Sequence, residues 1–404
     1  MMINYIIAFI ISLFSLFIAF FWFNVLYFTE PTKRKQLENF PLVSVIVPAY
    51  NEEEGIEKTI KSLLNSNYPK EKLEIVVVDD CSKDRTLELA KKYPITVLHN
   101  EVNIGKGASI NRALKVVKGE LVGVVDADSS ISDDAILRMV EHFGDKEISS
   151  VVSAMKVDHP RNLLERIQRV EYALGILMRK LLGNIGCLFL LHGGLTMYRT
   201  KILRRLGGFD EETITEDFEM GMRLLSKKYK IIAEDDAISY TSVPSSLKAL
   251  WSQRIRWYRG QIMHNIQYRK MLLNKDYGMM GLFQFPLNIL FPLTLMTTLF
   301  LSIYGLFRAF YVNLVGFEAV GIDFISSNLD MKLFFYSLNY QLIFIVLSLL
   351  LLSIYFMYKA YYISRESIWA PGSLFIFVFM YPYLIVTHWF GAIYKEIKRE
   401  KRKW

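Results

Sequence analysis

Uncharged apolar runs near both ends of this chain divide it into regions with different physical surroundings. Residues 6–28 contain no charged side chain and exceed the roughly 20 residues that a helix needs to cross about 30 Å of hydrocarbon. Three more apolar runs lie at residues 281–307, 333–358 and 372–393. The region 41–275 has no such run. Because 52% of the chain is hydrophobic, we expect a soluble domain flanked by membrane-spanning helices.

The first apolar run predicts an uncleaved transmembrane anchor at residues 1–30. A secretory signal peptide is the alternative, but its apolar core usually has roughly 7–15 residues and is followed by a small-residue cleavage site. The run at 6–28 is longer, and no such site follows it.

Charges beside the apolar runs predict that the central domain faces the cytoplasm. Residues 33–35 are Lys, Arg and Lys, whereas the loop at 318–332 has three carboxylates and a single cation. Since loops rich in Lys and Arg stay on the cytoplasmic side, we expect the domain at the inner side of the cell membrane. The basic tail at 395–404 should also be cytoplasmic, but three crossings after the domain would place it outside. The prolines within 279–312 leave open an interfacial helix or a further crossing.

The net charge of +8 does not by itself indicate nucleic-acid binding. The excess cations lie in the tail and beside the apolar runs, where attraction to anionic headgroups explains them better. We therefore expect membrane lipids, and no nucleic acid, among the partners. Cys81 and Cys187 lie far apart in sequence, and a cytoplasmic location argues against a disulfide.

Between residues 41 and 240, short β-rich runs alternate with helical segments. The runs lie at residues 43–50, 74–80, 95–99 and 120–128. This alternation predicts an α/β domain with a mainly parallel sheet flanked by helices. In such sheets ligands bind outside the carboxyl ends of the strands. This chain places polar side chains there: Asn51, Asp79, Asp80, Asp126 and Asp128.

Asp126 and Asp128 are candidate metal ligands. Two carboxylates two residues apart at a strand end can reach one hard cation, and Mg²⁺ or Mn²⁺ prefers oxygen ligands from carboxylates and substrate phosphates. A solvated loop is the simpler explanation, because this pattern is common by chance. The apolar run that precedes Asp126 and the acidic end of the run at 74–80 favour the metal site.

Three further side chains are candidate contacts to a nucleotide. Asp79 could accept a hydrogen bond from the ring N–H of a base such as uracil, and Glu52 could bind a ribose hydroxyl. The alternative is that the polar residues at 80–84 cap the next helix. Lys106 lies between two glycines that would let the backbone approach a diphosphate, although an ordinary helix start explains it nearly as well.

Six sequence blocks occur in one fixed order within about residues 41–265. They are VSVIVPAYNEE, VVDDCSKDRT, NIGKGASIN, VVDADS, GGFDEETITEDFEMGMRL and LWSQRIRWYRG. The blocks resemble those of family-2 glycosyltransferases, in particular the membrane-embedded inverting synthases of poly-N-acetylglucosamine, hyaluronan and cellulose. The resemblance implies a GT-A nucleotide-sugar-binding domain, a UDP-sugar donor and a divalent cation.

Asp217, in the block ITED, would by that resemblance be the general base. A hydroxyl acceptor needs a nearby carboxylate to take its proton as it attacks. Glu216 and Asp217 would also favour the start of a helix through its dipole, and that argument does not distinguish between them. The family pattern selects Asp217.

Gln253, Arg256 and Trp257 are spaced so that one helix face carries an amide, a guanidinium and an indole. Arg256 could neutralise the departing diphosphate, Gln253 is a candidate contact to the nucleotide sugar, and Trp257 could lie under the acceptor sugar. The alternative is a basic amphipathic helix at the membrane surface. Gly193 and Gly194 could let the backbone approach the acceptor, although a tight turn explains them equally well.

These expectations describe a membrane-bound inverting enzyme that transfers sugar from a UDP-sugar to a growing polysaccharide. One alternative is a single transfer to a polyprenyl phosphate or glycolipid, and another is a non-catalytic membrane subunit that keeps the fold. The expected organisation is an anchor at 1–30, a cytoplasmic catalytic domain at 41–240, interfacial helices at 241–278, a transmembrane region at 279–394 and a basic tail at 395–404.

Overall fold

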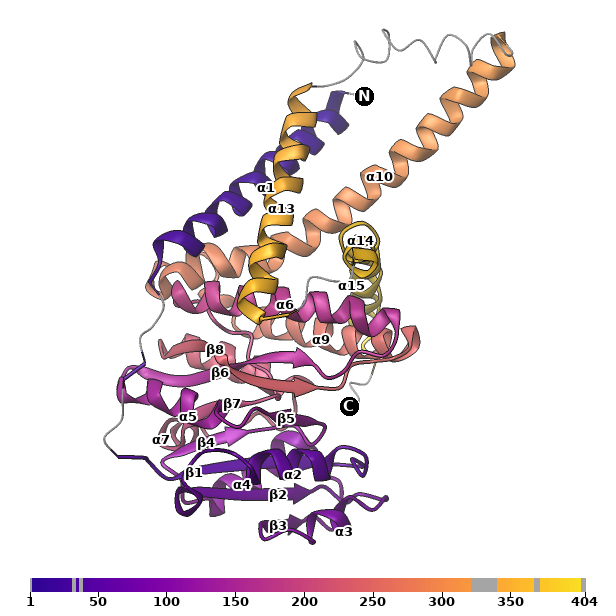
Figure 1. The fold of residues 1–404 in the computed structure, drawn as a ribbon. Helices are drawn as coiled ribbons and strands as arrows, with labels where there is room; N and C mark the ends of the chain where they lie inside the picture. The colour runs from indigo at the N-terminus through magenta and orange to yellow at the C-terminus, as the bar shows by residue number, and fades with distance from the viewer. Residues whose placement is uncertain (1, 31–33, 36–38, 321–339, 367–370, 401–404) are drawn as a thin grey trace.

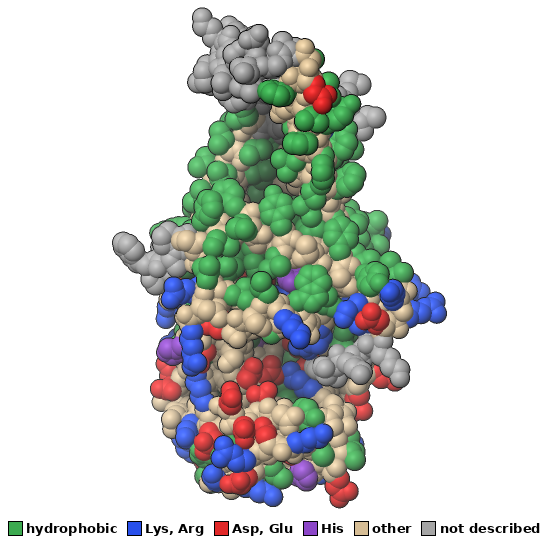
Figure 2. Space-filling model, turned by 90° about the vertical axis from the view of Figure 1, so that its right-hand side faces the viewer, with side chains coloured by type: hydrophobic (Ala, Val, Ile, Leu, Met, Phe, Trp, Pro, Cys, Tyr) green, Lys and Arg blue, Asp and Glu red, His purple; other side chains and the backbone are tan. Residues whose placement is uncertain are grey.

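The structure is a computed structural model that describes residues 2–30, 34–35, 39–320, 340–366 and 371–400. An α/β domain forms its lower part, and long helices extend from one side of that domain (Figure 1). Hydrophobic side chains cover the upper part of the molecule, and charged side chains concentrate on the lower part (Figure 2). The apolar runs and the charged central region therefore lie in separate parts of the molecule.

A mixed, mostly parallel sheet forms the centre of the domain, and the described residues contribute eight strands in the order β3-β2-β1-β4-β7-β6-β8-β5. Their bounds are β1 Val43–Ala49, β2 Leu73–Asp79, β3 Thr96–His99, β4 Leu121–Val124, β5 Ser129–Ile131, β6 Ile148–Val157, β7 Thr196–Arg199 and β8 Lys230–Thr241. β1 pairs in parallel with β2 and β4, whereas β7 is antiparallel to β4 and β6. β1 is buried along its whole length, as its continuous apolar sequence predicts for a strand covered on both faces.

The fourth predicted strand, 120–128, is shorter in the structure. β4 ends at Val124, and the N–H of Asp126 donates a hydrogen bond to the carbonyl of Gly193 at 2.7 Å. The chain then enters β5, which pairs antiparallel with β8. Asp126 and Asp128 therefore lie in the turn between two strands, where their side chains are not committed to either face of the sheet.

Helices cover both faces of the sheet. In the domain they are α2 Ile56–Leu64, α3 Thr86–Ala90, α4 Lys106–Val116, α5 Ala135–Val140, α6 Leu163–Asn184, α7 Thr200–Arg205, α8 Glu216–Ser226 and α9 Leu247–Gln267. Two hydrophobic cores result, one under α4, α6 and α8 and the other under α2 and α5. The first core continues into Trp22 and Ala360, which belong to the apolar helices α1 (Met2–Phe28) and α13 (Tyr340–Ser364). The apolar helices are therefore packed onto the domain.

Among the described residues, three helices are long and apolar enough to cross a membrane: Ile6–Phe28, Met280–Ala319 and Ile343–Ser364. They correspond to α1, to α10 (Phe285–Val320) with the π-helical turn before it, and to α13. A fourth span is possible only if α14 (Pro371–Phe379) and α15 (Tyr381–Ile397), which are bent by 47°, count as one. The start of the run expected at 333–358, the acidic positions 323 and 330, and the tail beyond residue 400 lie outside the described residues.

α15 packs mainly against α9 and also contacts the long helix α10 (Figure 1). The rings of Tyr258 and Trp389 stack at 4.5 Å between these two helices. Arg259 Nε lies 2.6 Å from Glu396 Oε1, and its Nη2 donates to the Glu400 carbonyl at 2.7 Å. These contacts hold the end of α15 against the domain.

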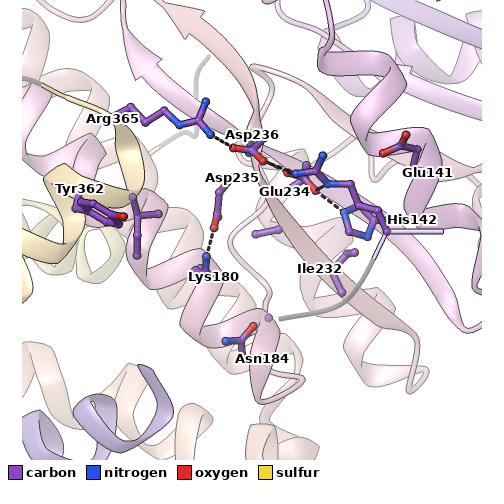
Figure 3. Close-up of a pocket in the computed structure, with 14 residues that line it drawn as sticks. Glu141, His142, Lys180, Asn184, Ile232, Glu234, Asp235, Asp236, Tyr362 and Arg365 are labelled. Atoms are coloured by element: carbon purple, nitrogen blue, oxygen red, sulfur yellow. Dashed lines mark hydrogen bonds and ion pairs between the residues drawn. The ribbon is translucent and has the colours of Figure 1, made fainter. Parts of the chain in front are cut away.

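An 850 Å³ cavity lies where the domain meets the apolar helices (Figure 3). Three successive carboxylates of β8, at residues 234–236, contact basic side chains from other segments. Those partners are Arg34, Arg138, His142, Lys180 and Arg365. Since Arg34 follows α1 and Arg365 follows α13, the ion pairs around this cavity connect two of the apolar helices to the sheet.

Candidate active site

A 410 Å³ cleft lies at the carboxyl ends of β1 and β4. It is lined by Pro48, Ala49, Tyr50, Glu52, Asp80, Asn103, Gly105, Lys106, Ser109, Asp126, Ala127, Asp128 and Arg256. Five of the residues expected from the sequence are among them: Glu52, Lys106, Asp126, Asp128 and Arg256. The fold therefore brings side chains from distant parts of the chain to one edge of the sheet.

Glu52, Asp126 and Asp128 form an acidic wall of this cleft. Burial and the neighbouring carboxylates of Asp128 and Asp126 raise the pKa of Glu52 to about 7. Burial and Asp126 likewise raise the pKa of Asp128 to about 6. Because like charges this close repel one another, the site favours the uptake of a proton or of a cation.

The acidic wall fits a divalent cation that is shared with a phosphate ligand. Within the described part of the chain, no group of three or more His, Cys, Asp or Glu side chains could hold a metal ion by itself. Mg²⁺ usually takes only one or two protein carboxylates and completes its shell with phosphate oxygens and water. Asp126 and Asp128 supply that number of carboxylates, so a diphosphate would have to supply further ligands.

Lys106 connects the acidic wall to the first turn of α8. Its Nζ lies 2.6 Å from Asp126 Oδ1 and 2.6 Å from Glu216 Oε1. Burial alone would lower the pKa of Lys106, but Asp126, Glu216 and Asp217 raise it above its usual value. Lys106 is therefore charged and links two of the sequence blocks through ion pairs, a role that its position between glycines did not reveal.

Asp80, rather than Asp79, lines the cleft. The carboxylate of Asp80 accepts hydrogen bonds from the N–H groups of Ile104 at 2.9 Å and Gly105 at 2.8 Å, which places the start of α4. Asp79 is fully buried, and its Oδ2 lies 2.8 Å from His99 Nδ1. The expected contact between Asp79 and a nucleotide base stays a prediction.

Asp217 lies in the first turn of α8, close enough to Lys106 for the two charges to interact. Burial and the adjacent Glu216 raise the pKa of Asp217 to about 7. Among the described residues, Glu216 forms an ion pair with Lys106, whereas Asp217 forms none. The helix-dipole argument did not distinguish Glu216 from Asp217, but their surroundings differ. The pKa of Asp217 is suited to accepting a proton near neutral pH.

The three α9 residues expected to bind donor and acceptor differ in their positions. Arg256 lines the cleft, and its Nη1 donates to the Ile214 carbonyl at 3.1 Å. Gln253 and Trp257 are half-buried and do not line the cleft; both contact the side chain of Arg254. Arg254 and Arg259 are buried and ion-paired, which differs from the lipid-facing helix considered as the alternative.

Sequence reasoning missed the contact that seats α9 on the loop before α8. A Cβ on Gly260 would come within 2.2 Å of Thr215 Oγ1, so the helix backbone approaches that loop closely. His264 Nε2 lies 3.0 Å from Thr213 Oγ1 and 3.1 Å from Thr215 Oγ1. Gly260 and His264 follow Trp257 at helical spacing, and that periodicity is the signal that could have identified them.

Gly193 and Gly194 pack closely against neighbouring side chains, and Gly193 lies against Asp126 of the acidic wall. A Cβ on Gly193 would collide with the carboxylate of Asp126, and one on Gly194 would collide with Met155 and Ser239. Neither glycine lines the cleft, so their expected contact with an acceptor stays a prediction.

Residues 44–207 match the family model described as Glycosyl transferase family 2. The chain is 31% identical over 225 residues to a poly-beta-1,6-N-acetyl-D-glucosamine synthase of Staphylococcus epidermidis, with 54% of each chain covered. It is also 31% identical over 252 residues to a beta-monoglucosyldiacylglycerol synthase of Nostoc sp., covering 59% of this chain and 53% of the relative. The chain therefore spans about half the length of the curated relatives it matches.

Among solved structures, the mannosyltransferase PcManGT of Pyrobaculum calidifontis, in complex with GDP-Man and Mn²⁺, aligns with 99% of this chain and 98% of its own. The TM-score is 0.65 and the sequence identity 20%. This likeness is one of fold, and it extends over both the α/β domain and the apolar helices. It confirms the fold class expected from the sequence.

Proposed function

We propose that this chain, whose residues 44–207 match glycosyl transferase family 2, is an integral-membrane inverting enzyme that adds sugar from a UDP-sugar to a growing polysaccharide. The observation that carries this proposal is the convergence on one cleft of the Asp126 and Asp128 carboxylates, Lys106 and Arg256, with Asp217 beside them. Each of these groups has a distinct part in the transfer.

In the proposed mechanism, Asp126 and Asp128 would hold Mg²⁺ or Mn²⁺. When bound, the ion would offset the charge that develops on the departing diphosphate. Arg256, which also lines the cleft, would add a positive charge beside the diphosphate, and Glu52 and Lys106 would contact the donor. Asp217 would take the proton of the acceptor hydroxyl as that oxygen attacks the anomeric carbon from the face opposite the nucleotide, which inverts the configuration.

The acceptor separates two versions of this function. A growing polysaccharide is favoured by the tryptophan at position 257 on the helix that carries Arg256, and by the polymer named for the Staphylococcus relative. Single transfer to a lipid is supported by the diacylglycerol product named for the Nostoc relative, which is equally similar in sequence. A polyprenyl phosphate would be a lipid acceptor of the same kind.

We further propose that the domain of residues 41–240 is cytoplasmic and that α1, α10 and α13 cross the cell membrane. In this arrangement α14 and α15 would lie at the inner membrane surface, next to the interfacial helices of residues 241–278. Two crossings after the domain return the basic tail to the cytoplasm. The contacts of Arg259 with the end of α15 support this count, because they tie that end to the domain.

The direct test uses the purified full chain in lipid nanodiscs with Mn²⁺ and a panel of radiolabelled UDP-sugars, with GDP-mannose included. The label is then separated into high-molecular-mass polymer and solvent-extractable lipid. Polymer supports the favoured version, and labelled lipid supports single transfer. Incorporation into neither fraction with any donor would leave the non-catalytic subunit as the better explanation.

A further inference from the structure

The arginine inside the QRIRW block is buried between helices. Only 1% of Arg254 is exposed, and its guanidinium contacts side chains of α6 and α9. Nη2 lies 2.6 Å from Glu171 Oε2 on α6, and Nη1 donates to Gln253 Oε1 at 2.9 Å. The guanidinium carbon lies 4.0 Å from the centre of the Trp257 ring. Arg254 therefore touches both α9 side chains that were expected to bind substrates but that do not line the cleft.

Glu171 extends this contact to the C-terminal helices. Its Oε2 also accepts a hydrogen bond from the Tyr381 hydroxyl at 2.7 Å. Tyr381 is the first residue of α15 and is 3% exposed. One carboxylate thus joins α6, α9 and α15, three helices that are far apart in the sequence.

The buried charges in this contact are paired with each other. Burial alone would lower the pKa of Arg254, but Glu171 raises it, so the guanidinium stays charged. A buried charge that loses its partner is strongly destabilising, so Arg254 and Glu171 are held to each other. The planar guanidinium also stacks on the indole, a geometry that a lysine ammonium cannot reproduce. The position of the Trp257 ring is therefore set by the position of Glu171 and, through it, of Tyr381.

We propose that Arg254, Glu171 and Tyr381 are positioning residues that hold Trp257 in place for the acceptor. Through Tyr381, the C-terminal helix α15 would then stabilise the acceptor side of the site. This inference rests on the proposed function, in which Trp257 contacts the acceptor. Arg254 covers one face of the indole, and an acceptor sugar would use the other. None of the three residues needs to touch a substrate for this role.

The test compares Tyr381→Phe with Tyr383→Phe in the full chain in nanodiscs. The first variant removes one hydroxyl that binds Glu171, whereas the Tyr383 side chain is exposed and its hydroxyl makes no hydrogen bond among the described residues. The probes are UDP-N-acetylglucosamine and a β-1,6-linked N-acetylglucosamine oligomer, or the pair that the donor panel selects. For Tyr381→Phe we expect the acceptor KM to rise about fivefold while the donor KM changes by less than about twofold. Tyr383→Phe should match the wild type.

A second readout does not depend on transfer. Tryptophans are replaced by 5-fluorotryptophan, and the fluorine resonance of Trp257 is assigned by its loss in Trp257→Phe. Tyr381→Phe should shift or broaden that resonance, Arg254→Lys should do so as well, and Tyr383→Phe should not.

An unchanged Trp257 resonance and acceptor KM in Tyr381→Phe would overturn the inference. Equal increases in donor and acceptor KM would overturn it too, because they indicate general loosening of the fold. If the wild type transfers no sugar from any donor, the proposed function fails, and the fluorine comparison still decides whether Tyr381 positions Trp257.

Discussion

Gly193 and Asp126 lie in direct contact: a Cβ on Gly193 would come within 2.1 Å of Asp126 Oδ2, and the Asp126 N–H donates to the Gly193 carbonyl at 2.7 Å. The absence of a side chain at Gly193 therefore determines where the Asp126 carboxylate can lie. Gly193, whose expected contact with the acceptor stays a prediction, thus supports a proposed metal ligand.

Gly193→Ala should displace the Asp126 carboxylate and so weaken metal-dependent donor binding by about 10- to 100-fold, as loss of support around a metal ligand usually does. Titration of UDP with and without Mn²⁺ measures this. Gly183→Ala is the control, because its nearest heavy atom would be 3.5 Å away and it lies within helix α6. Donor binding by Gly193→Ala equal to that of the wild type would show that the contact does not matter.

Asp217→Asn should lower the transfer rate by about 100-fold or more, because an amide cannot take the acceptor proton. UDP binding should stay nearly intact, since Asp217 does not line the nucleotide cleft. Glu216→Gln is the comparison: it breaks the ion pair with Lys106 but keeps the Asp217 carboxylate, so its loss of rate should be smaller. Loss of UDP binding in Asp217→Asn would instead indicate a structural role.

The pH dependence of transfer should reflect the pKa of Asp217, which burial and Glu216 raise to about 7. The base works only when deprotonated, so kcat/KM should level off above that pH and fall about tenfold per unit below it. Donor binding is measured in the same buffers, because protonation of Asp128, with a pKa of about 6, would weaken binding at lower pH. A flat profile across neutral pH would argue against Asp217 as the base.

Asp128→Asn should weaken the binding of the donor in the presence of Mn²⁺ much more than in the presence of EDTA, because the amide is a poorer ligand for a hard cation. Asp276→Asn serves as the control, since Asp276 is exposed and its carboxylate makes no ion pair among the described residues. An unchanged metal requirement in Asp128→Asn would count against Asp128 as a ligand.

The membrane topology can be checked with single cysteines in a Cys81→Ser, Cys187→Ala background. Lys398→Cys should react with a membrane-impermeant maleimide only after the cells are permeabilised, because Arg259 holds the end of α15 against the domain. Glu318→Cys, near the far end of α10, should react in intact cells. Reaction of Lys398→Cys in intact cells would show that α14 and α15 cross the membrane as one span.

Much of the architecture could be predicted because its signals are local. The uncharged run at 6–28 has to be an apolar helix, since only a helix satisfies its own backbone in hydrocarbon. The β-rich runs at 74–80 and 120–128 placed carboxylates at the edge of the sheet where ligands bind in such folds, and the structure brings Glu52, Lys106 and Arg256 to the same edge.

The tertiary structure alone decided which of two neighbouring side chains lines the cleft and which partner each charged side chain has. Whether Asp79 or Asp80 lines the cleft, whether Lys106 pairs with Glu216, and whether Arg254 faces lipid or Glu171 all depend on contacts between segments far apart in the chain. Periodicity and spacing describe one segment at a time, so they identify the groups that carry charge but not their partners. Burial then determines which of these groups must be paired, because an ionised group removed from water keeps its charge only beside a compensating charge.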